Sequence, residues 1–175
     1  MKKLLLTLIL LIPALTLLAQ KDHYLKEGPL SLTIPNDNWM PINPTRTKTS
    51  IIYHYKRLNT KDSTGKKAFP EIVITIEQVH ADMELTKFSL SKQKPYQSLK
   101  GYKAEKVFTD SDGMLRLHYA VGHKAYYEDA HGVKHTFYFI HAIKQNKGIQ
   151  VIIDTPSSLF DTLEEEFTSV IRSLD

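Results

Sequence analysis

The chain has 175 residues, 42% of them hydrophobic and 24% charged, with a formal net charge of +4. This length and composition are those of one globular domain, and they exclude a disordered or low-complexity chain. The absence of cysteine excludes a disulfide scaffold, a cysteine-ligated zinc or iron–sulfur site, a thiol nucleophile and a lipid anchor on cysteine.

The first nineteen residues have the layout of a secretory signal peptide. Lys2 and Lys3 precede an apolar stretch over residues 4–18, and Ala19 is a small residue suited to the position before a cleavage site. The stretch is shorter than the ~20 residues of a membrane-spanning helix, although an uncleaved N-terminal anchor is the alternative. We expect cleavage after Ala19 and export of residues 20–175 as one soluble domain, to the periplasm or the cell exterior.

The charge of the exported form argues against a nucleic-acid partner. Loss of Lys2 and Lys3 lowers the net charge from +4 to +2, and the longest remaining basic run is Lys66-Lys67. Nucleic-acid-binding domains gather basic residues into a patch, which this sequence lacks. No apolar run after the signal reaches membrane length, so no transmembrane segment is expected in the mature protein.

The first half of the mature chain is predicted to hold three strands and one helix. Alternating apolar and polar residues predict strands over 30–34, 50–56 and 71–79. A polar stretch predicts an exposed loop over 57–69, and Trp39 is expected to close the sheet edge after the first strand. Helical spacing predicts a helix from Asp82 to Leu99. Pro95 should kink it or divide it into two short helices, because proline lacks the N–H that the helix needs.

The second half is predicted to hold four strands and a terminal helix. Strands are expected over 102–109, 114–127, 133–144 and 149–154. The run Asp110-Ser111-Asp112-Gly113 predicts a tight hairpin turn, and short connections make the late strands antiparallel. Thr155-Pro156 opens an amphipathic helix whose solvent side should carry Glu164, Glu165 and Glu166. The prediction is an α+β fold, an α/β/α sandwich with a mainly antiparallel sheet of six to seven strands and helices on its faces.

Three segments carry a resemblance to a known fold family. They are SLTIPNDNWM (31–40), ITIEQVHADMELTKFSLSK (74–92) and GIQVIIDTPSSLFDTLEEEFTSVIRSLD (148–175). With the hairpins between them, residues 28–175 resemble the PsbP-like fold, whose members include an extrinsic photosystem II subunit, a Ran-binding nuclear import factor and bacterial secretion chaperones. The resemblance implies a sandwich that binds partners, since members act mostly as assembly factors or adaptors rather than enzymes. It transfers no site residue.

The late hairpin holds five of the eight histidines and suggests a metal site. A five-residue loop over 128–132 would make His123 and His135 diagonal neighbours, with backbones about 7–8 Å apart. Two imidazoles at that separation can share a zinc or copper ion. The alternative is that these histidines bond to neighbouring side chains or to solvent.

No motif for catalysis is present. The sequence lacks Gly-x-Ser-x-Gly, His-Glu-x-x-His and a glycine-rich phosphate loop, so neither an enzyme nor a cofactor is predicted. Binding residues concentrate on loops over a rigid scaffold, which makes Lys61, Lys66 and His131 the candidate partner-binding residues.

The prediction from sequence is an exported, non-enzymatic binding or assembly-factor protein of the bacterial cell envelope, adaptor-like or chaperone-like, whose partner is an envelope protein. The alternative is a periplasmic protein that binds a small ligand or a metal through aromatic and histidine residues of the late hairpin. The oligomeric state is left open.

Overall fold

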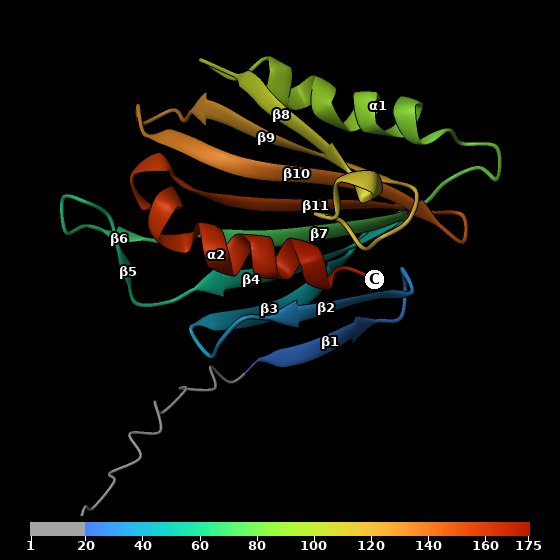
Figure 1. The fold of residues 1–175 in the computed structure, drawn as a ribbon, viewed down its shortest axis with the longest axis horizontal. Coiled ribbons are helices and arrows are strands. Elements are labelled where there is room, and N and C mark those ends of the chain that lie inside the picture. The colour runs from blue at the N-terminus through green and yellow to red at the C-terminus, as the bar shows by residue number, and fades with distance from the viewer. Residues whose placement is uncertain (1–19) are drawn as a thin grey trace, which may run out of the picture.

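A computed structural model describes residues 20–175, and the predicted signal peptide at 1–19 lies outside these described residues. One seven-stranded antiparallel sheet organises the chain (Figure 1), with strand order β3-β4-β7-β11-β10-β9-β8. The strands are β3 (Trp39–Arg46), β4 (Ser50–Arg57), β7 (Glu71–Gln78), β11 (Lys147–Pro156), β10 (Lys134–Lys144), β9 (Ala120–Glu128) and β8 (Lys103–Thr109). The predicted α+β class and antiparallel sheet are confirmed.

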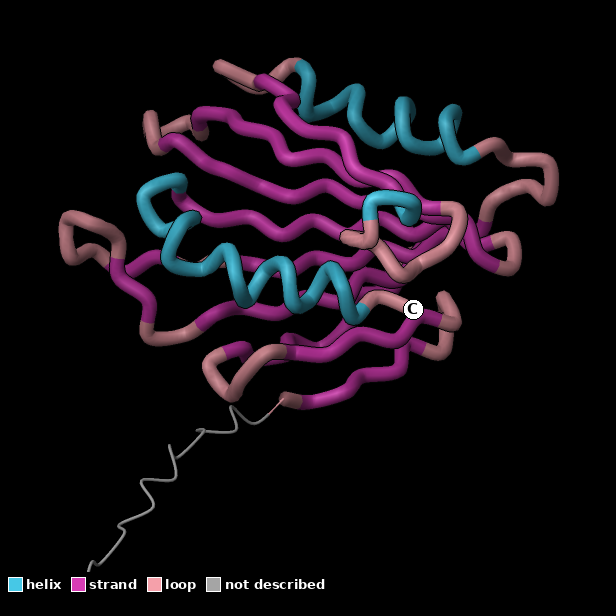
Figure 2. The backbone as a smooth tube through the Cα atoms, in the orientation of Figure 1, coloured by secondary structure: helices cyan, strands magenta, loops and turns pink. Residues whose placement is uncertain are grey.

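Two helices, α1 (Leu85–Gln97) and α2 (Ser157–Ser173), pack on opposite faces of this sheet. Successive side chains of a strand point to opposite faces, and along β10 His141 contacts Ser89 of α1 whereas Tyr138 contacts Phe160 of α2. A two-stranded sheet of β1 (Lys21–Leu25) and β2 (Leu30–Ile34) lies beside α2 (Figures 1 and 2).

The main hydrophobic core lies between the sheet, α2 and the β1–β2 hairpin. The apolar stripe predicted for the terminal helix is buried there: Leu159, Phe160, Leu163, Phe167, Val170 and Ile171. The three isoleucines of β7, at positions 72, 74 and 76, face the same core. Ser31 of β2 exchanges two backbone hydrogen bonds with Asp175, of 2.7 and 3.1 Å, which attaches the end of the chain to this layer.

The opposite face is only partly covered. Helix α1 lies over β9 and β10, where Ala125, Phe137 and Phe139 form a smaller buried cluster. Beyond the edge of α1, Ile52 and Val73 on the same face keep part of their surface exposed.

Several predicted boundaries were wrong. The first helix begins at Leu85 after Glu84 rather than at Asp82, and it is one helix with Pro95 inside it. Pro95 lies in the last turn, so almost no helix follows the position that it would break. Strand β9 begins only at Ala120, because Tyr119 has φ of 54°, which no strand accommodates.

The predicted hairpin at Asp110–Gly113 is also different in the structure. Residues Asp110–Asp112 form a 3-10 helix, and the irregular segment after it contributes the buried side chains of Leu115 and Leu117 to the main core. Strands β1 and β3 were not predicted, and neither were the two-residue strands β5 (Thr60–Lys61) and β6 (Lys67–Ala68).

Candidate functional site

The three candidate partner-binding residues lie at one end of the sheet, which we call the loop end. The β4–β7 connection, residues 58–70, and the β9–β10 connection, residues 129–133, both leave the sheet there. Lys61 and Lys66 are exposed on the first connection, and His131 is exposed on the second.

Residues 58–70 form a short arm that projects from the sheet (Figure 2). Asp62 accepts hydrogen bonds from the backbone N–H of Thr64 (2.8 Å) and of Lys66 (3.0 Å), which gives the turn a defined shape. The hydrogen bond from the Thr64 hydroxyl and these two backbone bonds hold the pKa of Asp62 below its usual value. The exposed side chains of Lys61, Lys66 and Lys67 give the tip a positive charge. The predicted loop over 57–69 is exposed at its tip, but Thr60 and Ala68 at its base are buried and pair as short strands.

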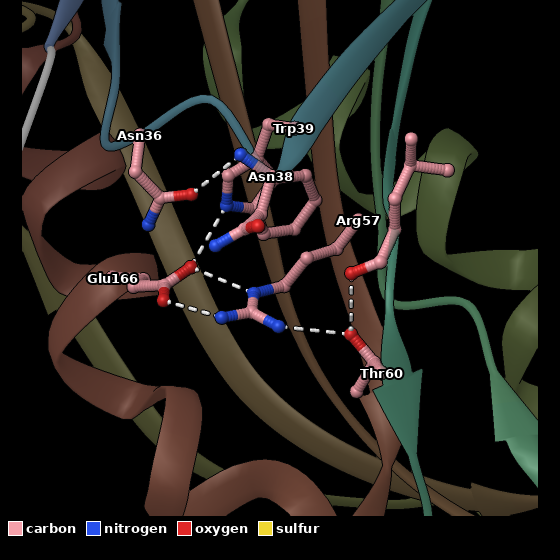
Figure 3. A network of polar contacts seen from close by, with 7 residues as sticks. Asn36, Asn38, Trp39, Arg57, Thr60 and Glu166 are labelled. Carbon is pink, nitrogen blue, oxygen red and sulfur yellow. Dashed lines mark hydrogen bonds and ion pairs between the residues drawn. The ribbon is translucent and has the colours of Figure 1, made fainter.

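A polar network fixes the base of the arm to α2 (Figure 3). Arg57 at the end of β4 donates two hydrogen bonds to the carboxylate of Glu166, of 3.0 and 2.9 Å, and one of 2.9 Å to Thr60 Oγ1. Trp39 Nε1 donates to the same carboxylate at 2.8 Å. Burial alone would raise the pKa of Glu166, but the hydrogen bonds from Arg57 and Trp39 outweigh it and lower the pKa. The prediction that Glu166 lies on a solvated helix face was therefore wrong.

A second polar cluster lies where β10 and β11 reach the loop end. His135 Nδ1 lies 3.1 Å from Asp154 Oδ1, and Tyr127 donates a 2.8 Å hydrogen bond to Asp154 Oδ2. The Tyr127 and His135 rings stack with centroids 4.8 Å apart. Burial lowers the pKa of His135, but Asp154 and then Asp129 raise it by more, so the net shift is upward. A cavity of about 400 Å³ adjoins the cluster and is also lined by Lys103, Tyr126, Lys134 and Ser157.

The structure does not bring His123 and His135 together. His123 pairs with Phe139 and His135 pairs with Tyr127, so the register differs by two residues from the predicted one. The side chain of Asp129 accepts hydrogen bonds from the N–H groups of His131 and Val133, both at 2.8 Å. The loop therefore covers residues 129–133 instead of the expected 128–132. The diagonal neighbour of His123 is instead His141.

His141 and His123 belong to a buried network under α1 that sequence reasoning missed. Ser89 Oγ lies 2.9 Å from His141 Nδ1, and Gln93 Nε2 lies 2.9 Å from Ser89 Oγ and 3.0 Å from His123 Nε2. The sequence signal was the spacing of four between Ser89 and Gln93, which places both on one helix face. Nothing in the sequence indicated which strand positions this face would meet.

Within residues 20–175, no three or more histidine, aspartate or glutamate side chains gather closely enough to hold a metal ion. Over the same residues, no helix combines the length and the hydropathy that crossing a bilayer requires.

Solved structures of similar shape place the chain among PsbP-like folds. The cyanobacterial PsbP protein of Synechocystis superposes with a TM-score of 0.60 and 13% identity, over 93% of this chain and 95% of that one. For the Ran-binding protein Mog1p of Saccharomyces cerevisiae the TM-score is 0.56 at 10% identity, over 90% and 95% of the two chains. For LpqN, involved in cell envelope biogenesis of Mycobacterium tuberculosis, it is 0.54 at 16% identity, over 83% and 81%.

No protein-family model matches the sequence, and no curated protein matches it. Identities this low show the fold alone. The chain therefore has a PsbP-like fold, as the three sequence segments indicated.

Proposed function

We propose that the chain is an exported, non-enzymatic binding or assembly-factor protein of the bacterial cell envelope, adaptor-like or chaperone-like. It contacts an envelope protein through the loop end of the sheet, with Lys61, Lys66 and His131 in the contact. The fold is compatible with this role, because proteins of the same fold include one named for binding Ran and one named for cell envelope biogenesis.

One observation carries this proposal: the arm combines a rigid base with a charged, exposed tip. Glu166 and Arg57 hold the base on α2, and Asp62 shapes the turn at the tip. The entropic cost of ordering this arm is therefore already met within the domain, so binding does not need to order it. The three lysines of the tip favour an acidic surface on the partner, which also speeds the encounter.

Site-specific crosslinking in the native cells tests the placement. A photo-crosslinking amino acid replaces Lys66 at the tip, and in a matched strain it replaces Lys48, an exposed lysine in the β3–β4 turn at the opposite end. The expected result is one dominant envelope protein joined from position 66 and none from position 48. Crosslinks from neither position, or equally from both, would contradict the proposed surface.

Export has its own test. Sequencing of the N-terminus of the protein recovered from envelope and cytosolic fractions should find Gln20 as the first residue, in the envelope fraction. An intact Met1 on the mature protein would overturn both the cleavage and the exported state.

A small-ligand role is the second candidate, favoured by the cavity beside His135. Its volume of about 400 Å³ lies in the range of small-molecule sites, and Tyr126, Tyr127 and His135 supply aromatic and polar walls. Native mass spectrometry of protein purified from its own cells should then show a bound mass that His135→Ala removes.

A further inference from the structure

Helix α1 is attached to the sheet through few apolar side chains and a buried polar network, and its partly buried Tyr96 packs on Phe137 and Phe139. Its buried residues are Phe88, Ser89 and Gln93, and the apolar side chain of Leu90 is 57% exposed to solvent. Helix α2, by contrast, buries six apolar side chains. Burial of apolar area is the main force that holds a helix on a sheet, so α1 should separate from the sheet at a lower free energy than α2.

The polar contacts under α1 fit neutral imidazoles. The Gln93 amide donates to Ser89 Oγ and to His123 Nε2, so His123 acts as an acceptor there. The Ser89 hydroxyl accepts from Gln93, and its own hydrogen is then free to be donated to His141 Nδ1, 2.9 Å away. A proton on His123 Nε2 would face the Gln93 donor directly and break this chain of hydrogen bonds.

His141 is the deepest member of the network. Its side chain is fully buried, between the rings of Phe88 and Phe139, and its Nε2 has no hydrogen-bond partner among the described residues. Burial, then the neighbouring His123 and Lys92, lower the pKa of His141 to about 3. An imidazolium at this position would be a buried, unpaired charge.

No carboxylate compensates for a proton on His141. The titratable groups that face it are Lys92 from α1 and His123 from β9, while β11 places the neutral amide of Gln150 opposite it. The carboxylate of Glu77 on β7 is 2.6 Å from Lys92 Nζ and is already paired with that amine. Among the described residues, the two groups that act on the charge of His141, Lys92 and His123, thus both oppose its protonation.

We propose that α1 is a pH-controlled cover on the sheet: protonation of His141 and His123 releases this helix while the rest of the fold stays intact. Release uncovers Phe137 and Phe139. The uncovered surface is continuous with partly exposed apolar residues, because Phe139 pairs with Ile152 and Ile152 pairs with Val73 in one cross-strand row. The inference does not depend on the proposed function of the loop end.

The size of the effect follows from linkage. In the released state His141 is solvated and recovers a pKa near 6.5, whereas in the closed state the pKa is about 3. The equilibrium constant for release then rises about 30-fold between pH 8 and pH 5 from His141 alone. His123, whose pKa is also lowered by burial, acts in the same direction.

The cysteine-free chain allows a direct test by thiol labelling. Ala125 lies in the cluster covered by α1 and Ala142 in the core covered by α2, and both are 0% exposed. Ala125→Cys and Ala142→Cys are each alkylated at pH 8 and pH 5, and each rate is divided by that of the urea-unfolded variant at the same pH. We expect the thiol of Ala125→Cys to react faster than that of Ala142→Cys and to gain about 30-fold at pH 5, with weak dependence on added urea.

The two histidines are tested in the same background. His123→Gln and His141→Asn keep an acceptor oxygen near the original ring nitrogen and remove the titration. In a chain that also carries Ala125→Cys, these two substitutions should abolish the increase in the normalised alkylation rate between pH 8 and pH 5. Equal labelling of the two thiols would mean that only global unfolding exposes them, and that result, or a gain that survives the two substitutions, would overturn the proposal.

Hydrogen exchange of the unmodified chain provides a second measurement if a variant fails to fold. The amides of α1 should lose protection at pH 5, after correction for intrinsic rates, while those at the centre of β10 keep theirs. Unchanged protection of α1 would equally count against release.

Discussion

Glu166 of α2 and Arg57 of β4 lie 109 positions apart in the chain, yet two hydrogen bonds of 2.9 and 3.0 Å join their side chains. The planar guanidinium offers two parallel donors to the two carboxylate oxygens, which fixes the angle between helix and strand as well as their separation. Trp39 shares one of these oxygens, so three elements meet at a single carboxylate. This contact sets the orientation of the arm that begins directly after Arg57.

Removal of the Glu166 carboxylate should destabilise the whole domain. In Glu166→Ala, the N–H donors of the buried Trp39 and the largely buried Arg57 lose their acceptor, and we expect the free energy of unfolding to fall by about 2–3 kcal/mol. Urea titration followed by Trp39 fluorescence measures this, because Trp39 is the one tryptophan of the chain. Glu165→Ala is the matched control, since its exposed neighbouring side chain should change stability by no more than about 0.5 kcal/mol. Equal effects of the two substitutions would show that the network contributes nothing.

His135 and His141 lie on the same face of β10, yet their pKa values should shift in opposite directions from that of a free histidine. Asp154 and Asp129 outweigh burial and raise the pKa of His135, whereas burial lowers the pKa of His141 to about 3. Histidine NMR spectra between pH 8 and pH 5 should therefore show His135 with a midpoint above 6.5 and show no titration of closed-state His141. A midpoint near 6.5 for both would contradict the two environments.

The same two histidines give opposite contributions to stability. The stabilising contribution of His135 is complete below pH 6.5 and is lost as the pH rises through its raised folded-state pKa. The contribution of the neutral His141 is complete above pH 6.5. It is lost as the pH falls towards about 3, because the unfolded chain binds a proton that the folded state does not. His141→Asn should therefore reduce the loss of stability between pH 7 and pH 5, and urea midpoints at the two pH values measure it. A fall of equal size in the variant would refute this assignment.

Gly148 of β11 permits the close approach of α1. A Cβ at this position would lie 2.5 Å from Cε2 of Phe88, so Gly148→Ala forces the helix or the ring away from the strand. We expect the free energy of unfolding to fall by about 1–3 kcal/mol. Urea unfolding monitored by far-UV circular dichroism measures this change. The cost should be smaller in a Phe88→Leu background, because the shorter side chain leaves room. Independent, additive effects would show that the two residues do not limit each other.

The periodic elements could be predicted from the sequence because one physical signal dominates each of them. The alternation around Ile72, Ile74 and Ile76 and the stripe through Phe160 and Phe167 both reflect burial on a single face, and both are confirmed. Strand β3 lacks such a signal. Of its eight residues only Trp39 is buried, and its two prolines suit an edge strand.

The polar contacts could not be predicted, because they depend on register and on distant segments. The two-residue shift in the late hairpin comes from side-chain hydrogen bonds of Asp129, and it exchanges His135 for His141 as the neighbour of His123. Likewise, helix phase separates Glu166 from Glu165, but nothing in the local sequence indicated that Arg57 and Trp39, both distant in the chain, would bind the Glu166 carboxylate. Local spacing does not identify the distant partner in either case.

Removal of the tip of the arm should separate partner capture from folding. Thr60 must be retained, because it is buried and its hydroxyl accepts a hydrogen bond from Arg57. We therefore expect replacement of residues 61–67 by a short Gly-Ser turn to change the urea midpoint little, since the side chains removed are mostly exposed. Crosslinking of the envelope partner from position 131 should decrease at least tenfold, because the charged tip is absent. The charge-reversal pair Lys61→Glu and Lys66→Glu should give the same loss with the backbone intact, whereas Lys48→Glu should not. Full capture by the shortened chain would place the contact elsewhere on the domain.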